Sequence, residues 1–206
     1  MKKIRRFLKP IILAISIIIF VIITRLLLID KISSFDSKVY EIITSIKCKP
    51  VTMFFKVITV FSNTWFVMLL TAIIMIISKN KKRTFYISLN VIICFLLNQV
   101  FKFIFARERP LGINLISEDG YSFPSGHSMI SVAFYGFLAY MYLHSNKSRK
   151  NRLITIIFFV VLAFLIGISR IYLGVHYASD VLAGFALSLA YLIIYVSLFY
   201  NAKKRF

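Results

Sequence analysis

The chain has 206 residues, 60% of them hydrophobic, and its 26 Lys and Arg residues against seven Asp and Glu residues give a net charge of +19. This composition excludes an ordinary soluble domain, whose residues are much more polar. The basic residues form short clusters between long apolar runs, a pattern typical of cytoplasmic loops and not of a nucleic-acid-binding surface. We therefore expect an all-α, polytopic membrane protein that forms one domain over residues 1–206 and binds no nucleic acid.

The first predicted span covers residues 10–28, an apolar run that follows a basic N-terminal segment. A cleaved signal peptide begins in the same way. This run is long for a signal peptide, however, and no small-residue cleavage pattern follows it. We therefore expect a retained first helix.

Residues 30–49 are polar by comparison, and their apolar residues recur at helical spacing at Val39, Ile42, Ile43 and Ile46. This periodicity predicts an amphipathic helix. A position in the membrane interface and packing against the rest of the bundle explain it equally well, so both interpretations stay open.

Five further spans are predicted. The second begins at Pro50, a residue suited to the first turn of a helix, and runs to about Ser78. The others cover residues 84–105, about 124–143, 153–168 and 177–200.

Six spans place the N-terminus, the two basic loops and the C-terminus on one side of the membrane, and these segments hold more than half of the Lys and Arg residues. By the positive-inside rule this side is the cytoplasm. The outer side then receives residues 30–49, the loop over 106–126 and the turn over 169–176, and all seven acidic residues fall on or near it. We predict a multi-pass plasma-membrane protein with cytoplasmic termini and its active site on the extracytoplasmic side.

Three charged residues lie close together in an otherwise apolar region at the start of the last span, namely Arg170, His176 and Asp180. Charged groups there are costly unless they face a water-filled site and have partners. On a helix, His176 and Asp180 stack on one face, so Asp180 accepts a hydrogen bond from one imidazole nitrogen and leaves the other as a nucleophile or base. A helix cap with a structural ion pair is the alternative interpretation.

Two other segments reach the same predicted end of the bundle, and they supply Lys102, Arg107, Arg109, Ser125, Gly126 and His127. Lys102, Arg109 and Arg170 would offset the charge of a phosphate and of its transition state. Ser125 and Gly126 begin a helix, where free N–H groups and the helix dipole favour an anion. Several cations with few nearby acids therefore predict a phosphate site.

The two histidines of this region divide the predicted chemistry. His176, oriented by Asp180, would attack phosphorus and carry a transient phosphohistidine. His127 would protonate the departing oxygen, and water would then hydrolyse the phosphoenzyme.

Other polar residues receive no role. Glu118 and Asp119 are interpreted as a solvated turn, and His144 as an interface residue at the cytoplasmic end of its span. Cys48 falls in an exposed segment and Cys94 in mid-span, so we expect neither a disulfide nor a metal site from them.

Three fixed spacings occur in order within residues 100–182. The first is a lysine, six residues and Arg-Pro, the second is Pro-Ser-Gly-His, and the third is Ser-Arg, five residues, His, three residues and Asp. They are matched by Lys102 to Arg109-Pro110, by Pro124 to His127, and by Ser169-Arg170 with His176 and Asp180. On these motifs the chain resembles the type 2 phosphatidic acid phosphatases, membrane lipid phosphate phosphatases related to vanadium haloperoxidases and bacterial acid phosphatases.

The resemblance implies His176 as the nucleophile, Asp180 as its partner and His127 as the leaving-group acid. It also implies phosphate binding by Lys102, Arg109, Ser125, Gly126 and Arg170, and catalysis without a metal or another cofactor. Arg107 lies outside the family pattern, and we interpret it as a neighbour that strengthens the field or contacts a lipid headgroup.

The predicted function is an integral membrane lipid phosphate phosphatase, and the composition suggests a small bacterial enzyme. Its candidate substrates are phosphatidylglycerophosphate, undecaprenyl diphosphate and phosphatidic acid, and the phosphate site is common to all three. A transporter or another non-catalytic anion-binding membrane protein would use the same cationic pocket without turnover. The chain lacks the matching broken spans typical of many transporters, which disfavours that alternative.

Overall fold

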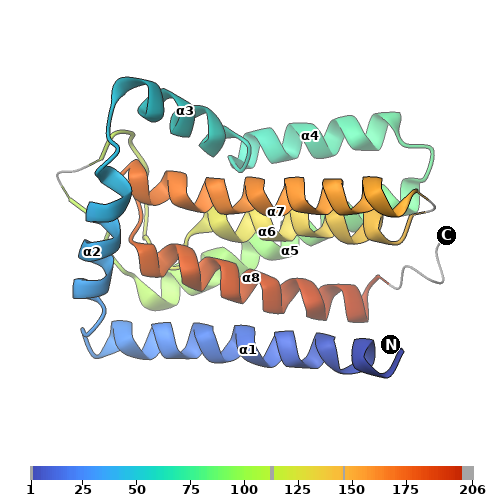
Figure 1. Cartoon of the computed structure of the whole chain (residues 1–206), viewed down its shortest axis with the longest axis horizontal. Helices are drawn as coiled ribbons and strands as arrows, with labels where there is room; N and C mark the ends of the chain where they lie inside the picture. Colours follow the sequence, from blue (N-terminus) through green and yellow to red (C-terminus); the bar gives the residue numbers. More distant parts are fainter. Residues whose placement is uncertain (1, 112–113, 146, 201–206) are drawn as a thin grey trace.

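The computed structural model describes residues 2–111, 114–145 and 147–200 (Figure 1). Within these ranges the chain is helical and forms no strand, as the sequence predicts. The helices are α1 (Lys2–Leu28), α2 (Ser33–Thr44), α3 (Lys49–Val60), α4 (Thr64–Ile77), α5 (Lys81–Phe105), α6 (Gly126–Leu143), α7 (Arg149–Tyr172) and α8 (Ala178–Leu198).

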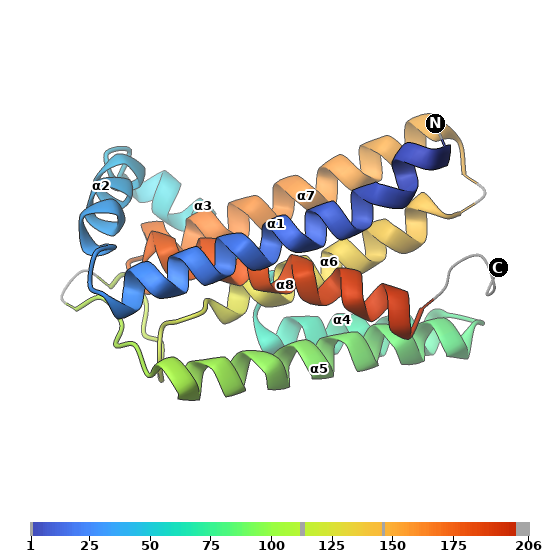
Figure 2. The same ribbon diagram turned by 90° about the horizontal axis from the view of Figure 1, so that it is seen from below.

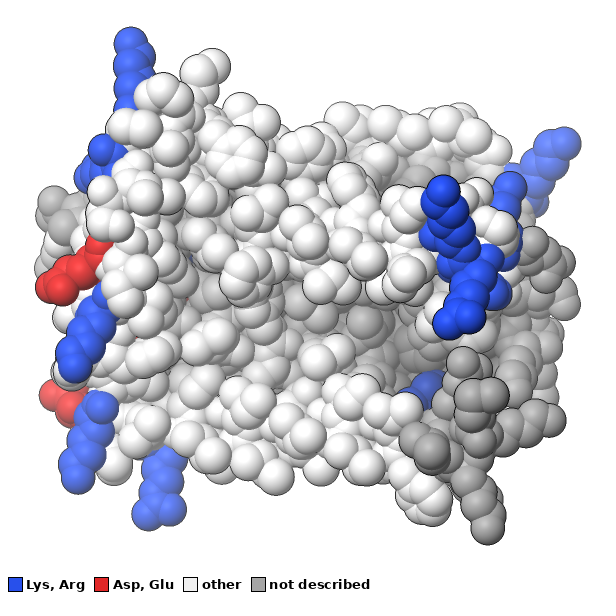
Figure 3. Space-filling model, in the orientation of Figure 1, with Lys and Arg blue, Asp and Glu red and all other residues white. Residues whose placement is uncertain are grey.

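The long helices run side by side along one axis, and α2 lies across one end of this bundle (Figures 1 and 2). The start of α1 and the end of α8 lie at the opposite end (Figure 1). On the face drawn in Figure 3, charged side chains gather at the two ends and leave an uncharged band between them. This distribution fits a bundle whose middle contacts lipid.

Four helices are long and apolar enough to cross a membrane, namely α1 from Phe7 onward, α5, α7 and α8. The bent pair of α3 and α4 brings the number to five if it counts as one span. The chain is therefore a multi-pass membrane protein.

The prediction of one continuous helix from Pro50 to Ser78 is wrong. The chain breaks between Val60 and Thr64, and α3 and α4 meet at an angle of 51°. The side chain of Asn63 accepts a hydrogen bond from the backbone N–H of Trp65 at 3.1 Å and so caps a new helix. Apolar composition alone did not reveal the break, because both halves are apolar.

Helix α6 is the inner helix of the bundle and contacts α5, α7 and α8. It is not among the helices that are apolar enough to cross by themselves. Its neighbours shield it instead, and its buried residues on several sides include Ser128, Ser131, Phe134 and Phe137. Helix α6 starts at the end of the bundle where α2 lies (Figure 1).

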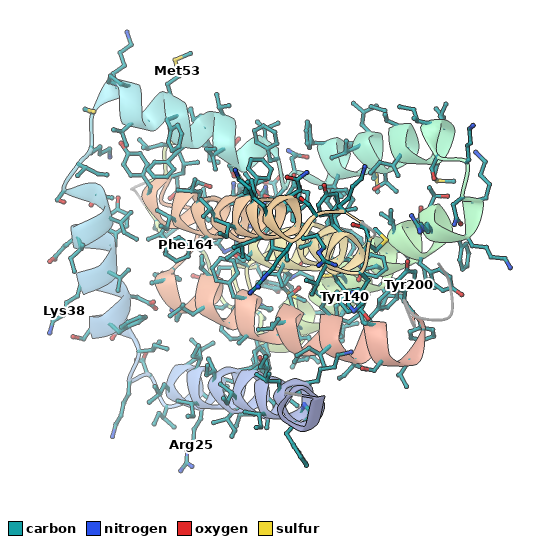
Figure 4. The ribbon with its side chains drawn as sticks, turned by 45° about the vertical axis from the view of Figure 1, so that its right-hand side comes forward. Arg25, Lys38, Met53, Tyr140, Phe164 and Tyr200 are labelled. Carbon is teal, nitrogen blue, oxygen red and sulfur yellow. The ribbon has the colours of Figure 1, made fainter. Side chains whose placement is uncertain are left out.

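Of the two positions considered for residues 30–49, the structure shows packing on the bundle. Val39, Tyr40 and Ile43 of α2 contact the ends of α7 and α8. Lys38 points away from the bundle, as does Arg25 near the end of α1 (Figure 4). At the other end of the molecule, Tyr140 and Tyr200 lie against each other.

Candidate active site

The three predicted motif segments meet at the end of the bundle where α2 lies. The ends of α5 and α7 and the starts of α6 and α8 all reach this end (Figures 1 and 2). Two connections cover them, the loop over 106–125 and the turn over 173–177. The topology therefore brings together residues that are separated by more than 70 positions in the chain.

His176 lies in the turn before α8 and not on the helix, so the prediction that it stacks with Asp180 on one helical face is wrong. Gly174 makes the turn with a φ of 74°, a backbone conformation that suits glycine. Asp180 lies in the first turn of α8, where its Oδ2 accepts the Tyr177 N–H at 2.9 Å. The same oxygen lies 3.4 Å from His176 Nδ1, so the predicted pairing forms by another local route.

The other ring nitrogen of His176 faces an arginine. Nε2 lies 3.2 Å from Arg109 Nη1. A guanidinium only donates, so Nε2 must accept, and the proton of the neutral ring then sits on Nδ1 toward Asp180. Burial lowers the pKa of His176 well below its usual value, and the positive charges of Arg170, Arg109 and Lys102 lower it further. The arrangement therefore holds a neutral imidazole whose unprotonated Nε2 faces a cluster of cations.

The two motif arginines are fixed by the protein. Arg170 is 0% exposed, and it donates to Thr59 Oγ1 of α3 at 2.6 Å and to Glu118 Oε1 at 2.5 Å. Arg109 donates to three backbone carbonyls, those of Asp119, Gly120 and Val175. Donors that the protein holds in one orientation, away from water, interact strongly with an anion.

Glu118 corrects a second prediction, since it is not part of a solvated turn. Its carboxylate lies 2.5 Å from Arg170 Nη2, 4.0 Å from Arg109 Nη2 and 4.0 Å from His127 Nε2. An acidic group thus lies among the side chains that were predicted to surround a phosphate. Asp119, by contrast, contributes its backbone carbonyl and is exposed.

Lys102 lies near the end of α5 and lines a cavity of about 620 Å³. The other lining residues come from α5 and the following loop: Gln99, Val100, Phe103, Ile104, Asp119, Gly120 and Tyr121. Phe103 and Ile104 are exposed on the outer face of α5. The cavity is therefore bordered by a cation on one side and by apolar, lipid-accessible side chains on another.

Ser125, Gly126 and His127 form the start of α6. The Ser125 hydroxyl caps the helix by accepting the Ser128 N–H at 3.4 Å, and its own N–H donates to the Asp180 carbonyl at 3.0 Å. A Cβ on Gly126 would meet Asn98 Oδ1 of α5 at 2.9 Å, so glycine permits the close approach of the two helices. Because the Ser125 N–H is bound to Asp180, it cannot bind a phosphate in this arrangement, in contrast to the prediction. The N–H groups that follow it, from Gly126 onward, begin the helix.

The sequence relationships agree with this geometry. The family model of the PAP2 superfamily matches residues 83–204, more than half of the chain. The chain belongs to the PAP2 superfamily. The resemblance to the type 2 phosphatidic acid phosphatases is thereby confirmed.

Two curated relatives are similar over part of the chain. Phosphatidylglycerophosphatase B of Bacillus subtilis (strain 168) is 44% identical over 112 residues, which are 54% of this chain and 55% of that protein. An undecaprenyl-diphosphatase of Sulfolobus acidocaldarius is 30% identical over 125 residues, 57% of this chain and 55% of that protein. The chain thus spans about half the length of the curated relatives it matches.

Two solved structures share the fold. The transmembrane PAP2-type phosphatidylglycerolphosphate phosphatase from Bacillus subtilis superposes with a TM-score of 0.82 at 29% identity, covering 90% of this chain and 94% of that one. Aquifex aeolicus LpxE superposes with a TM-score of 0.63 at 22% identity, covering 78% and 93%. The second likeness shows the fold alone.

Two polar residues of this PAP2 site lie outside the motifs and were given no role from the sequence, Asp36 of α2 and Thr59 of α3. Asp36 falls on the packed face of α2 with Val39, Tyr40 and Ile43. An acidic residue at the apolar positions of an amphipathic helix is a readable signal, because it must find a buried partner. Thr59 offers no comparable signal.

Arg107 also differs from its interpretation as a free neighbour or headgroup contact. It forms ion pairs with Asp36 at 2.8 Å and with Asp180 at 2.5 Å. Its guanidinium lies 3.9 Å from the centre of the Tyr177 ring. The charge of Arg107 is thus neutralised within the protein.

Proposed function

We propose that this chain is an integral membrane lipid phosphate phosphatase that works through a phosphohistidine at His176. One observation carries the proposal: the unprotonated Nε2 of a buried, neutral His176 faces a cluster of cations in which Arg170 is wholly buried. We call these cations, Lys102, Arg109 and Arg170, the cup. They suit a phosphate group and the additional charge of its transition state.

Binding comes first in the proposed mechanism. Lys102, Arg109 and Arg170 hold the phosphate of the substrate, together with the N–H groups at the start of α6 around Gly126. Ser125 supports this helix start as its cap. The incoming phosphate displaces the Glu118 carboxylate from Arg170, since both anions require the same donor.

Two displacements at phosphorus follow. In the first, the lone pair of His176 Nε2 forms a P–N bond while the bond from phosphorus to the lipid oxygen breaks, and His127 gives that oxygen a proton. In the second, His127 takes a proton from a water, the water oxygen bonds to phosphorus, and the P–N bond breaks. Asp180 stabilises the positive ring of the intermediate through Nδ1–H.

The membrane arrangement supports a lipid as the substrate. We propose six crossings, with the α3–α4 pair and the shielded α6 each counted as one, and with the active site on the extracytoplasmic side. The clusters of basic residues at the other end of the bundle support cytoplasmic termini. The cavity beside Lys102 borders exposed apolar residues of α5, so a lipid headgroup reaches the cup sideways from the bilayer.

Among the candidate lipids, phosphatidylglycerophosphate is the first choice. The curated relative with 44% identity is a phosphatidylglycerophosphatase, and the structure covering 90% of this chain is a phosphatidylglycerolphosphate phosphatase. Undecaprenyl diphosphate and phosphatidic acid are the comparison substrates.

The experiment is a side-by-side measurement of phosphate release from the three lipids by purified protein, with a chelator present. His176→Ala should abolish release, and His144→Ala at the other end of the bundle should not change it. Phosphate-analogue binding without turnover on any lipid would instead favour a transporter or another non-catalytic anion-binding protein. A reporter fused after Arg205 tests the orientation, because the proposed topology requires it to lie in the cytoplasm.

A further inference from the structure

A chain of buried charges connects α2 to the histidine of the active site. Asp36 is 3% exposed, and its Oδ2 lies 2.8 Å from Arg107 Nη2. Arg107 Nη1 in turn lies 2.5 Å from Asp180 Oδ1. Asp180 Oδ2 then faces His176 Nδ1 at 3.4 Å. We propose that Asp36 is a positioning residue for catalysis, which acts on His176 through Arg107 and Asp180, and this inference rests on the proposed function.

Arg107 is not the only partner of the Asp36 carboxylate. Besides Arg107, its carboxylate accepts the Ser179 N–H at 2.8 Å and the Ser179 hydroxyl at 2.7 Å. Ser179 lies in the first turn of α8, beside Asp180, where a negative charge is also favoured by the helix dipole. The Asp36 carboxylate therefore has a defined place relative to the catalytic carboxylate.

The geometry gives Asp36 a specific task, which is to divide the guanidinium of Arg107 between two carboxylates. Each carboxylate receives one nitrogen of Arg107, so Arg107 occupies only Oδ1 of Asp180 and leaves Oδ2 to Tyr177 and His176. Arginine and carboxylate prefer a two-pronged pairing when both are free to turn. Without Asp36, Arg107 would turn toward both oxygens of Asp180 and compete with His176 for Oδ2.

Charge leads to the same conclusion. When Nε2 of His176 bonds to phosphorus while Nδ1 keeps its proton, the imidazole ring becomes positive. Asp180 stabilises this charge, and Arg107 opposes it. Asp36 neutralises Arg107, so the set of Asp36, Arg107 and Asp180 keeps one net negative charge for the ring. Other charged groups nearby, Arg109 and Arg170, face the phosphate side of His176.

Asp36→Asn tests the proposal, because it keeps the size of the side chain and removes its charge. We expect kcat for phosphate release from phosphatidylglycerophosphate to fall about 10–100-fold, the scale known for outer residues that orient a functional group. KM should change much less, because the phosphate-binding residues are untouched. Glu41→Gln, on the exposed face of the same helix, is the matched control and should leave kcat unchanged.

The decisive measurement is the same substitution in an Arg107→Gln background. If Asp36 acts through Arg107, Asp36→Asn has no further effect on kcat there. A residue that only fastens α2 would show the same fold-loss in both backgrounds, or would lower the yield of folded protein without changing kcat. Either result overturns the proposal.

A second variant covers the case in which Asp36→Asn does not fold. Ser179→Ala removes one hydrogen bond from Asp36 and one from Arg107 but keeps both charges. The proposal is supported if Ser179→Ala lowers kcat at constant KM and if this loss is absent in the Arg107→Gln background. An unchanged kcat contradicts it. Absence of turnover by the unsubstituted protein would instead refute the proposed function, so the two failures are distinguishable.

Discussion

At the end of the bundle where α2 lies, Arg170 is fully buried and Arg109 is fixed on three backbone carbonyls. At the opposite end, Arg149 and Lys150 are exposed, and Arg152 reaches the carbonyls of Leu143 and Ser145 only at 3.4 Å. Both ends are therefore basic, but only one of them keeps its cations away from water. Charges interact far more strongly where water is excluded. The candidate site therefore depends on the burial of its cations and on their closeness to one another, and not on how many cations an end carries.

The histidines repeat this contrast. His176 is 2% exposed and lies between Asp180 and Arg109. His144 ends α6 at the other end of the bundle, where its ring packs on Tyr140 and its Nδ1 lies 2.9 Å from the Tyr140 carbonyl. In the described part of the chain, the ring of His144 contacts Tyr140 and forms no ion pair. Four predictions test whether the two ends differ in function as they differ in structure.

The largest effect is expected at Arg170. Lysine cannot hold Thr59, Glu118 or a phosphate with two nitrogens at once, so Arg170→Lys should lower kcat/KM on the order of 10²–10³-fold, as for the loss of one preorganised donor. Phosphate release measured at low substrate concentration checks this value. Arg152→Lys at the opposite end is the control. Similar losses in both variants would show that the difference in burial has no functional meaning.

The next effect concerns pH. Only neutral His176 can attack phosphorus, and its lowered pKa keeps it neutral to below pH 6.5. Once pH falls below that pKa, kcat/KM should drop about tenfold per pH unit, and on the alkaline side it should fall again when His127 loses the proton that it gives to the leaving oxygen. The pH profile of kcat/KM is corrected for the ionisation of the substrate phosphate, which is measured by ³¹P NMR in the detergent micelles of the assay. A kcat/KM that still rises with pH above pH 6.5 would contradict the assigned environment of His176.

A smaller effect is expected for Glu118→Gln. The substitution removes an anion that competes for Arg170, so vanadate and inorganic phosphate should inhibit about tenfold more tightly, a change of about 1.4 kcal/mol. The inhibition constants of the two anions provide the measurement. Asp119→Asn is the matched control on the exposed neighbour. Equal inhibition of Glu118→Gln and the original protein would mean that the carboxylate does not occupy the phosphate position.

The smallest effect is expected at the opposite end. His144→Ala removes a ring that packs on Tyr140, far along the bundle from the cup, and kcat/KM should stay within about twofold, as for a substitution outside the reacting set. Thermal unfolding in the same detergent separates any loss of folded protein from a loss of rate. A large fall in kcat/KM at unchanged stability would show that both ends take part in the reaction.

Much of the molecule could be predicted from local sequence. Helical content follows from long apolar runs, and the identities of Lys102, Arg109, His127, His176 and Asp180 follow from motif spacing. The break between α3 and α4 was missed, although the polar residues Ser62, Asn63 and Thr64 interrupt the apolar run there. The pairing of His176 with Asp180 was predicted correctly but for the wrong reason, because His176 lies in a turn and not on α8.

The sequence by itself determined which residue types are available and that the chain lies in a membrane, because motif spacing and hydropathy are properties of neighbouring residues. Only the tertiary structure decided their partners. Asp36 meets Ser179 across 143 positions, Arg170 meets Thr59 across 111 and Glu118 across 52. Ion pairs and hydrogen bonds form wherever packing places a donor beside an acceptor. A local sequence pattern does not show which distant residues the packing will bring together. For this reason the cup was predictable as a set of cations, whereas the carboxylates that orient and occupy it were not.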